Sequence, residues 1–343
     1  MEKILSICIP SYNVDKYLNE TLKSLCVKDV IDNIEVLIID DGSKDTTSEI
    51  AYSYCKKYPR TFFYYYKENG GYGSVLNLGI QLAKGKYFKI LDGDDWFNIE
   101  KLANLVLAMK KNNADIVCNN YCKIYSFTGK IEYINYMNIM ENKIYNFRDV
   151  YKWKSFDLPQ IAVKTSILKD NKVNNIDEKC LYVDNEYIVL SMAHVSTVVF
   201  IKDCIYFYRQ QREGQSISFD SVIKNYKDHQ KMVFSLMRFW KDIVLDKKIK
   251  SENKKFIANL IQRKIGSQFI IYFKFPYSNS IKEKLRDFDK NLQKSDGFKT
   301  LNEYSMPKSF VLLERKFNYN LTLIFSIFIK LRNKFLMLRG FGR

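Results

Sequence analysis

The residues Ile90-Leu91-Asp92-Gly93-Asp94-Asp95-Trp96-Phe97 place three carboxylates between an apolar run and an aromatic pair. We refer to these carboxylates, Asp92, Asp94 and Asp95, as the acidic cluster. Carboxylates at this density repel one another and lose hydration energy when buried, so they are stable either in water or around a cation. An all-oxygen ligand set suits a hard ion such as Mg²⁺ or Mn²⁺. The alternative for an isolated Asp-Gly-Asp string is a solvated turn, with Gly93 providing the bend.

The acidic cluster follows one of five short apolar runs that end in turn-forming or polar residues. These runs predict buried strands over residues 4–9, 34–39, 62–66, 87–91 and 115–119. Between them, apolar residues recur at the spacing of an amphipathic helix. The predicted helices span residues 17–25, 45–54, 75–83 and 100–111. Alternation of strand and helix at this spacing is typical of βαβ units and of a parallel sheet.

Four polar turns follow the first four predicted strands. They are residues 10–13 (PSYN), Asp40-Asp41, residues 69–74 (NGGYGS) and the acidic cluster. The carboxyl ends of parallel strands meet at one edge of a sheet, where ligands bind, so the four turns together predict a site. The glycine-rich turn lacks the GK[ST] ending of a P-loop. It also follows the third strand, whereas a Rossmann fingerprint follows the first.

Four sequence blocks resemble a known family in content, order and spacing. Residues 6–13 (SICIPSYN), 39–45 (IDDGSKD), 69–71 (NGG) and 91–96 (LDGDDW) resemble the family 2 glycosyltransferases of the GT-A fold, of bacterial surface-polysaccharide type. The resemblance covers roughly residues 4–220. It implies an α/β domain over residues 1–220, with a Rossmann-like, mostly parallel sheet flanked by helices. A mainly helical region then follows over residues 221–343.

The resemblance implies a nucleotide-sugar donor, with UDP as the expected nucleotide. Asp41 matches the aspartate that accepts a hydrogen bond from the base, and a carboxylate paired with a uracil imide N–H is charge-assisted. Leu76 stands where family members often carry Arg, so one positive contact of the pattern is not matched. The donor-binding residues that the resemblance implies are Pro10, Ser11, Tyr12, Asn13, Asp40, Asp41, Asn69, Gly70, Asp92, Gly93 and Asp94.

The acidic cluster resembles the DxD-type motif that holds a divalent metal on the donor diphosphate and contacts the ribose. The resemblance therefore implies Mn²⁺ or Mg²⁺ at Asp92, Asp94 and Asp95. Such an ion neutralises charge on the departing nucleoside diphosphate. The sequence leaves open which of the three carboxylates binds the ion directly.

Two later segments resemble acceptor-side parts of the family. Residues 158–164 (LPQIAVK) resemble an acceptor-side segment, and residues 181–187 (LYVDNEY) resemble the block that carries the general base. Asp184 matches that base, although Val183 stands where the family has its first acidic residue. Glu186 follows two positions later, and residues two apart on a helix do not share a face, so only one should meet substrate. The alternative for Asp184 is a helix-capping aspartate.

Residues 206–216 (YFYRQQREGQS) resemble the closing segment of the bacterial members of the family. Arg209 and Arg212 in this segment are expected to clamp the donor diphosphate or an anionic acceptor, because a guanidinium matches phosphate oxygens. The alternative for each is a solvated surface charge.

These matches imply an inverting, metal-dependent glycosyltransferase that moves a sugar to a hydroxyl of a glycan or lipid-linked acceptor in cell-surface polysaccharide or glycoconjugate synthesis. A single base opposite the leaving group gives inversion. The alternatives are a sugar nucleotidyltransferase and a basic nucleic-acid-binding protein. The first carries its basic glycine-rich loop after the first strand, where this chain has residues 10–13. The second would need a recognition motif that we do not find, so we expect no nucleic-acid partner.

The net charge of +17 is concentrated in the last third of the chain. Residues 1–220 contain 28 basic and 28 acidic residues, whereas residues 221–343 contain 27 and 10. The clearest predicted helices there span residues 223–240, 256–273 and 321–338. The last one mixes an apolar stretch with Lys and Arg, which suits peripheral contact with an anionic membrane surface. A packing helix or a homodimer interface is the equal alternative.

Seven cysteines at irregular spacing lack any CxxC pair, and the chain has only two histidines. We therefore expect a reducing cytoplasm, with no structural zinc and no disulfides. The first residues lead into strand-like sequence and do not resemble a signal peptide. No apolar run reaches the roughly 18 to 20 residues of a membrane span. The expected location is cytoplasmic, with peripheral contact at the inner face of the membrane as an option.

Overall fold

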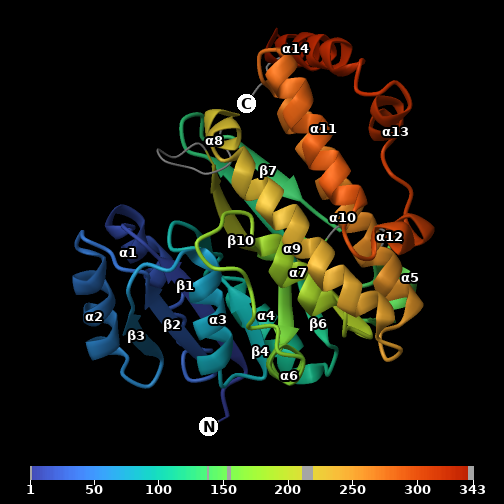
Figure 1. The fold of residues 1–343 in the computed structure, drawn as a ribbon. Helices are drawn as coiled ribbons and strands as arrows, with labels where there is room; N and C mark the ends of the chain where they lie inside the picture. Colours follow the sequence, from blue (N-terminus) through green and yellow to red (C-terminus); the bar gives the residue numbers. More distant parts are fainter. Residues whose placement is uncertain (1, 137–138, 153–155, 211–218, 339–343) are drawn as a thin grey trace. The chain divides into compact units, whose positions relative to one another are not determined.

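The computed structural model describes residues 2–136, 139–152, 156–210 and 219–338. The chain divides into two compact units, Met1–Glu213 and Gly214–Arg343. The boundary expected from the sequence lies at residue 220. Figure 1 labels most of the helices and strands of the two units.

The first unit is built on one sheet with the strand order β3-β2-β1-β4-β9-β6-β10-β5. Its first four strands run parallel: β1 (Leu5–Ser11), β2 (Ile34–Asp40), β3 (Phe62–Tyr66) and β4 (Tyr87–Ile90). Every residue of β2 is buried, as expected for a strand that is covered on both faces. Four helices alternate with these strands along the chain: α1 (Asp15–Lys23), α2 (Thr47–Lys57), α3 (Tyr72–Leu82) and α4 (Leu102–Lys111).

The second half of the sheet contains strands of both directions. β9 (Ile161–Lys164) enters antiparallel between β4 and β6 (Ile116–Tyr125), and β10 (Thr197–Gln210) runs parallel to β6. β5 (Trp96–Phe97), directly after the acidic cluster, pairs antiparallel with β10. Three shorter elements complete the edges: β7 (Ile131–Ile134) on β6, β8 (Ile144–Asn146) on β10, and α5 (Phe147–Val150).

The predicted α/β fold with a mostly parallel central sheet and a helical C-terminal region is confirmed. All five predicted strands and all four predicted helices of residues 1–120 are present. α3 begins at Tyr72, earlier than predicted, because Gly71 adopts a φ of 81° and ends the loop directly before it. β9 was not predicted as a strand, since its three consecutive apolar residues, 161–163, carry no periodicity.

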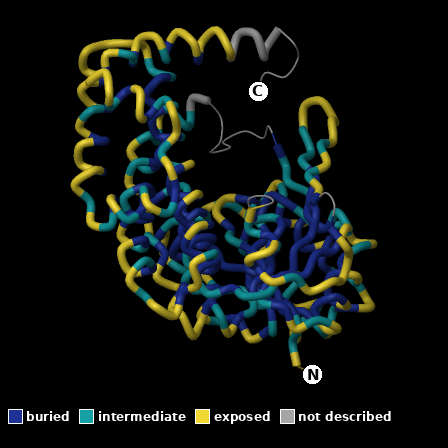
Figure 2. The backbone as a smooth tube through the Cα atoms, turned by 90° about the vertical axis from the view of Figure 1, so that its right-hand side faces the viewer, coloured by how far each residue is buried: buried dark blue, intermediate teal, exposed yellow. Residues whose placement is uncertain are grey.

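The second unit consists of helices gathered around α10 (Ser251–Lys274). Within this unit α10 packs against α9 (Tyr226–Leu245), α11 (Asn279–Gln293), α12 (Phe298–Tyr304) and α14 (Thr322–Leu338). Two short helices, α8 (Phe219–Lys224) and α13 (Ser309–Lys316), complete it. Figure 2 shows that much of α10 is buried. None of the described helices is long and apolar enough to cross a membrane.

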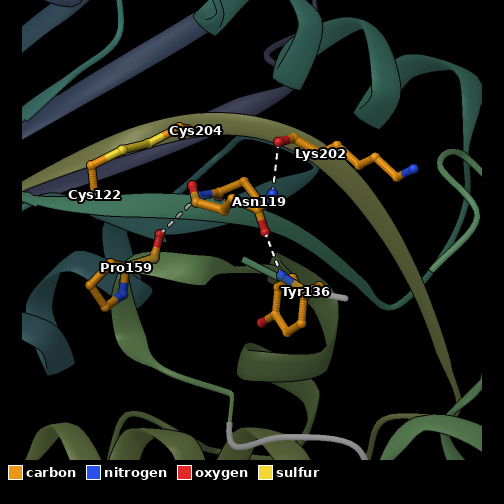
Figure 3. Close-up of a disulfide and its surroundings, with 7 residues drawn as sticks. Asn119, Cys122, Tyr136, Pro159, Lys202 and Cys204 are labelled. Atoms are coloured by element: carbon orange, nitrogen blue, oxygen red, sulfur yellow. Dashed lines mark hydrogen bonds between the residues drawn. A yellow bond between two sulfur atoms is a disulfide. The ribbon is translucent and has the colours of Figure 1, made fainter. Parts of the chain in front are cut away.

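The expectation of no disulfides is wrong in this structure. Cys122 of β6 and Cys204 of β10 are bonded, although they lie 82 residues apart in the sequence (Figure 3). The parallel pairing of the two strands is irregular on both sides of Cys204, and the Cα atoms of the two cysteines lie 6.4 Å apart. The sequence argument considered only cysteines that are near one another along the chain, so it had no means of detecting a pair made by strand order.

Candidate active site

The four polar turns predicted to form a site meet at the carboxyl edge of β1 to β4. The N–H of Asp41 donates to the carbonyl of Ser11 at 2.8 Å, which joins the first two turns. The N–H of Gly93 donates to the carbonyl of Pro10 at 3.2 Å, which joins the acidic cluster to the first turn. Together these backbone bonds make the edge one connected rim.

The first two turns are also joined through their side chains. Asn13 has a φ of 51°, a left-handed conformation that Asn tolerates better than most residues. Its N–H donates to Ser43 Oγ at 2.9 Å, and its Oδ1 accepts from the N–H of Lys44 at 2.9 Å. Tyr12, beside it, leaves half of its side chain exposed. The turn backbone is thus fixed while an aromatic ring remains available to a ligand.

Asp40 is a buried carboxylate that holds the second turn in place. Its Oδ1 accepts from the N–H of Ser43 at 2.7 Å, and its Oδ2 accepts from the Tyr64 hydroxyl at 2.8 Å. Both partners lie next to Asp40 in the fold, on its own turn and on β3. The structure therefore gives Asp40 a role in shaping the turn.

Asp41 anchors the glycine-rich loop that follows β3. Its Oδ1 accepts from Lys67 Nζ at 2.7 Å and from the N–H of Gly70 at 2.9 Å. Its Oδ2 accepts from the N–H of Gly71 at 2.8 Å, and its carbonyl accepts from Asn69 Nδ2 at 2.9 Å. Asp41 itself is only 4% exposed. One buried side chain thus sets the conformation of the whole loop.

Lys67 supplies a positive charge to this loop that the sequence analysis missed. Besides its ion pair with Asp41, its Nζ donates to Ser74 Oγ at 2.9 Å. The sequence pattern called for Arg at the position of Leu76, which is fully buried here. The positive charge at the glycine-rich loop therefore comes from Lys67, which precedes the loop, and not from position 76, which follows it.

The glycines of the loop allow close contact with the segment that leads to Asp184. A Cβ on Gly73 would lie 2.1 Å from the carbonyl oxygen of Asp177, and a Cβ on Gly71 would lie 3.1 Å from the Lys179 backbone. The N–H of Lys179 donates to the carbonyl of Gly70 at 2.8 Å. Larger residues at Gly71 and Gly73 would push the two segments apart.

Asn77 of α3 strengthens the same junction. Its side-chain amide donates to the carbonyl of Ile176 at 2.9 Å, and its Oδ1 accepts from the N–H of Ile176 at 3.0 Å. A two-way bond of this kind fixes both partners. The donor-side loop and the segment before Asp184 therefore form one hydrogen-bonded assembly.

The acidic cluster brings three carboxylates together at the rim. One oxygen of each of Asp92, Asp94 and Asp95 lies within 4.8 Å of the other two. Among the described residues, this is the one group of three His, Cys, Asp or Glu side chains close enough to share a cation. Thr21 of α1 fixes the backbone of the cluster, because its hydroxyl is within hydrogen-bond distance of the carbonyls of Gly93 and Asp95.

Asp95 is held inside the protein by β10. Its Oδ2 accepts from the Tyr206 hydroxyl at 2.6 Å, and its Oδ1 accepts from the N–H of Arg209 at 2.7 Å. Burial, with the charges of Asp94 and Asp92, raises the pKa of Asp95 well above its usual range. Both oxygens of Asp95 are therefore engaged by the fold.

Asp92 is linked to α3 and to the predicted base through Tyr72. The Tyr72 hydroxyl donates to Asp92 Oδ1 at 2.7 Å. Burial and the carboxylates of Asp92 and Asp184 together raise the pKa of Tyr72, so both acids lie near this ring. Tyr72 thus contacts Asp92 directly, and its hydroxyl is also affected by the charge of Asp184.

Asp184 and Glu186 differ in position, as their two-residue spacing predicted. Asp184 opens α7 (Asp184–Met192) and is partly exposed, with Oδ1 accepting from Asn185 Nδ2 at 3.1 Å. Glu186 is fully buried and accepts from the N–H of Asp177 at 2.8 Å. Of the two, Asp184 is the one whose side chain has exposed surface.

Arg209 lies against α1 and the acidic cluster. Its guanidinium sits 4.6 Å from the Trp96 ring centre and 5.0 Å from that of Tyr17. Its Nε donates to the carbonyl of Asp94 at 2.8 Å, and it forms an ion pair with Glu20 at 2.5 Å. These contacts give Arg209 a role in joining β10 to α1. Arg212 lies outside the described residues.

Lys89 of β4 is a fully buried cation behind the acidic cluster. Its Nζ donates to Asn119 Oδ1 at 2.9 Å and to the carbonyl of Pro159 at 2.8 Å. Burial lowers the pKa of Lys89 to about 7. Lys89 therefore ties β4 to β6 and to η1 (Leu158–Gln160), the segment the sequence placed on the acceptor side.

The sequence of this chain is similar to known glycosyltransferases. A family model described as Glycosyl transferase family 2 matches residues 6–171. The minor teichoic acid biosynthesis protein GgaB of Bacillus subtilis (strain 168) is 29% identical over 239 residues, which are 67% of this chain and 26% of that protein. The glycosyltransferase GlyG of Streptococcus pneumoniae serotype 4 is 28% identical over 228 residues, 62% of this chain and 72% of that protein.

A solved structure shares the fold. S. aureus TarS 1–349 in complex with UDP-GlcNAc superposes with a TM-score of 0.67, covering 88% of this chain and 84% of that chain at 18% identity. Identity at this level shows the architecture and nothing finer.

Proposed function

We propose that this chain, whose residues 6–171 match the model of glycosyl transferase family 2, transfers a sugar from a nucleoside diphosphate to a hydroxyl of a glycan or lipid-linked acceptor. The observation that carries the proposal is the connected rim. There the acidic cluster, the turn bearing Tyr12 and the loop anchored by Asp41 lie at the carboxyl edge of one sheet. Ligands of such sheets bind at this edge.

The acidic cluster suits a divalent cation. Its ligand atoms are all carboxylate oxygens within 4.8 Å of one another, the donor set that Mn²⁺ and Mg²⁺ prefer. Asp95 accepts hydrogen bonds at both oxygens from Tyr206 and Arg209, so we assign the ligand role to Asp92 and Asp94. When bound, the ion would neutralise the growing charge of the departing diphosphate.

The nucleotide is proposed to be UDP. TarS was solved with UDP-GlcNAc, and the present rim offers the same class of donor an exposed Tyr12 ring for the base. Asp41 already accepts three hydrogen bonds, and a carboxylate has about four acceptor positions, so it can take one more from a base N–H. The main structural role of Asp41 is still to fix the conformation of the glycine-rich loop.

Asp184 is proposed as the general base. As the acceptor oxygen bonds to the anomeric carbon, the bond from that carbon to the diphosphate oxygen breaks and the acceptor proton passes to the Asp184 carboxylate. A single displacement of this kind inverts the anomeric centre. Tyr72 connects the two carboxylates electrostatically, because it donates to Asp92 and the charge of Asp184 helps to raise its pKa.

The acceptor is proposed to be a cell-surface polymer. GgaB takes part in minor teichoic acid biosynthesis, and GlyG is a glycosyltransferase, although this chain covers only 26% of GgaB. A cytoplasmic enzyme acting on a lipid-linked acceptor would work at the inner face of the membrane. The basic helical unit is the part of the chain that would hold it there.

Product analysis tests the proposed reaction. Purified protein is incubated with UDP-sugars, Mn²⁺ and a teichoic-acid-type or lipid-linked acceptor, and released UDP is measured. Asp184→Asn should keep UDP binding and lower turnover by about 10²–10⁴-fold, the usual contribution of a general base. The matched control is Asp177→Asn, since Asp177 lies in the same segment and enters the argument only through its backbone N–H and carbonyl.

Two outcomes would contradict the proposal. Release of pyrophosphate in place of UDP would indicate a sugar nucleotidyltransferase. Near-normal turnover of Asp184→Asn, with Asp177→Asn also active, would remove Asp184 from the chemistry.

A further inference from the structure

Helix α14 is exposed along much of its described length (Figure 2), and its exposed positions carry an apolar stripe on the surface of the second unit. Its members are between 43% and 62% exposed: Leu323, Ile324, Ile327, Phe328 and Leu331. At 3.6 residues per turn they fall within an arc of about 140° on one face of the helix. A continuous apolar face of this kind on a folded unit marks an interaction surface.

The opposite face of α14 is occupied by the rest of the unit. Thr322 is fully buried, Ser326 is 2% exposed and Ile329 is 9% exposed. α14 packs against α10, which supplies the core of this unit. The helix is thus anchored by one face while the apolar stripe faces outward.

Basic residues border the apolar stripe on both sides. Lys330 and Arg332 are exposed, and helical geometry places them roughly 20° and 40° beyond its two edges. No Asp or Glu occurs anywhere between residues 322 and 338. The exposed face of α14 therefore combines an apolar stripe with positively charged residues along both of its edges.

We propose that α14 lies in the surface of an anionic bilayer, with the apolar stripe among the acyl chains and Lys330 and Arg332 at the headgroups. An apolar face bordered by long basic side chains is the pattern of interfacial helices. A second copy of this helix would bring basic edges against basic edges, which is unfavourable. An anionic leaflet supplies the complementary charge, and the excess of 27 basic over 10 acidic residues in residues 221–343 adds to it.

This inference deepens the proposed function by naming lipid as the partner of the enzyme, but its test does not depend on catalysis. The full chain is floated with vesicles of phosphatidylcholine alone and with vesicles containing 30% phosphatidylglycerol, about the charge density at which basic surfaces bind. The expected result is binding to the anionic vesicles, weakened by salt. Asp184→Asn should bind as well as the wild type, because it lies in the other unit.

Two variants and two controls test the stripe and its edges. Phe328→Ser should lower the partition coefficient about tenfold, because a large apolar side chain leaves the bilayer. Phe127→Ser removes an equally exposed Phe, at 75%, from a turn of the first unit and should have no effect. Lys330→Ala with Arg332→Ala should also cost about tenfold at low salt, whereas Lys247→Ala with Lys248→Ala should cost less.

The alternatives give distinct results. Absence of binding to anionic vesicles, or equal loss for Phe127→Ser and Phe328→Ser, would overturn the proposal. A dimer at micromolar concentration that Phe328→Ser converts to a monomer would assign the stripe to a second copy and overturn it as well. All of the substituted side chains are exposed, so the variants should fold.

Discussion

The turn after β2 and the turn after β4 lie on the same rim and both concentrate carboxylates, but they stabilise them differently. Asp41 accepts from the ammonium group of Lys67 and from two glycine N–H groups. The donors that reach Asp92 and Asp95 include two tyrosine hydroxyls and one backbone N–H, all of them neutral. The ion pair with Lys67 thus gives the first turn a counter-charge, whereas the three bonds named for the second turn orient its carboxylates and do not themselves neutralise them.

The difference indicates separate tasks for the two turns. A carboxylate that is paired with a lysine and with backbone donors is a fixed structural clamp. Neutral donors orient a carboxylate without adding a counter-charge, and burial makes its negative charge costly until a cation shares it. Residue counts alone do not separate these cases, since both turns carry adjacent aspartates.

Asp94→Asn should have the largest effect on activity. Removal of one proposed ligand should lower kcat/KM by about 10³-fold, because charge stabilisation of several kcal/mol is lost. Mn²⁺ binding, measured by calorimetry with and without UDP, should weaken in parallel. Asp95→Asn is the matched comparison, and it should mainly lower the melting temperature, since Asp95 binds Tyr206 and Arg209. If Asp95→Asn alone abolished Mn²⁺ binding, the ligand assignment within the acidic cluster would be reversed.

Lys67→Met tests the counter-charge of the other turn. It leaves the buried Asp41 carboxylate with backbone donors only, so we expect a loss of about 2 kcal/mol in the free energy of unfolding. The donor KM should rise roughly tenfold, because the loop over Asp41 loosens. Lys44→Met is the control, since Lys44 is exposed in the same turn. Equal effects of the two variants would show that the ion pair does not hold the loop.

Much of the fold was predictable because the first 120 residues repeat one pattern. Apolar runs such as 34–39 are followed by polar turns and amphipathic helices, and local sequence determines all three. β9 was missed because its place between β4 and β6 is set by tertiary pairing. The bond between Cys122 and Cys204 was missed for the same reason, since it depends on which strands are neighbours.

The site was predictable in its residues but not in its contacts. The four turns were identified because motif chemistry is local, and the structure brings them together. Lys67 and Tyr72 were missed, although Tyr72 lies inside the glycine-rich turn, because only the packing of α3 places its hydroxyl on Asp92. Arg209 was expected on the diphosphate, and its ion pair with Glu20 could not be read from residues far apart in sequence.

Tyr72→Phe should have a smaller effect than loss of a carboxylate. Asp92 would lose one neutral donor, so we expect kcat/KM to fall about tenfold, the effect of one hydrogen bond. The apparent Mn²⁺ affinity should fall by a similar factor, which a general loss of packing would not produce. Tyr66→Phe is the control, because Tyr66 ends β3 with 63% of its side chain exposed. Unchanged Mn²⁺ affinity in Tyr72→Phe would mean that the hydroxyl does not position Asp92.

Lys89→Met should affect activity least and the pH dependence of stability most. Burial lowers the pKa of Lys89 to about 7, whereas an unfolded lysine titrates near 10.5. Between these values the unfolded state binds more protons, so the stability of the wild type rises with pH, by up to about 1.4 kcal/mol per unit from this group. Urea unfolding at pH 7 and pH 9 should show this rise in the wild type and a smaller one in Lys89→Met.

The difference in pH dependence between the wild type and Lys89→Met reports the titration of Lys89 separately from that of neighbouring groups. The buried Cys118 thiol faces the same space, and burial raises its pKa, so it opposes the rise only above its ordinary titration range. That contribution is common to both proteins and cancels in the difference of slopes. Parallel slopes for the wild type and Lys89→Met would mean that the buried ammonium keeps its proton throughout. In that case the support behind the acidic cluster would carry a full positive charge, and the contrast between the two turns would be weaker than we infer.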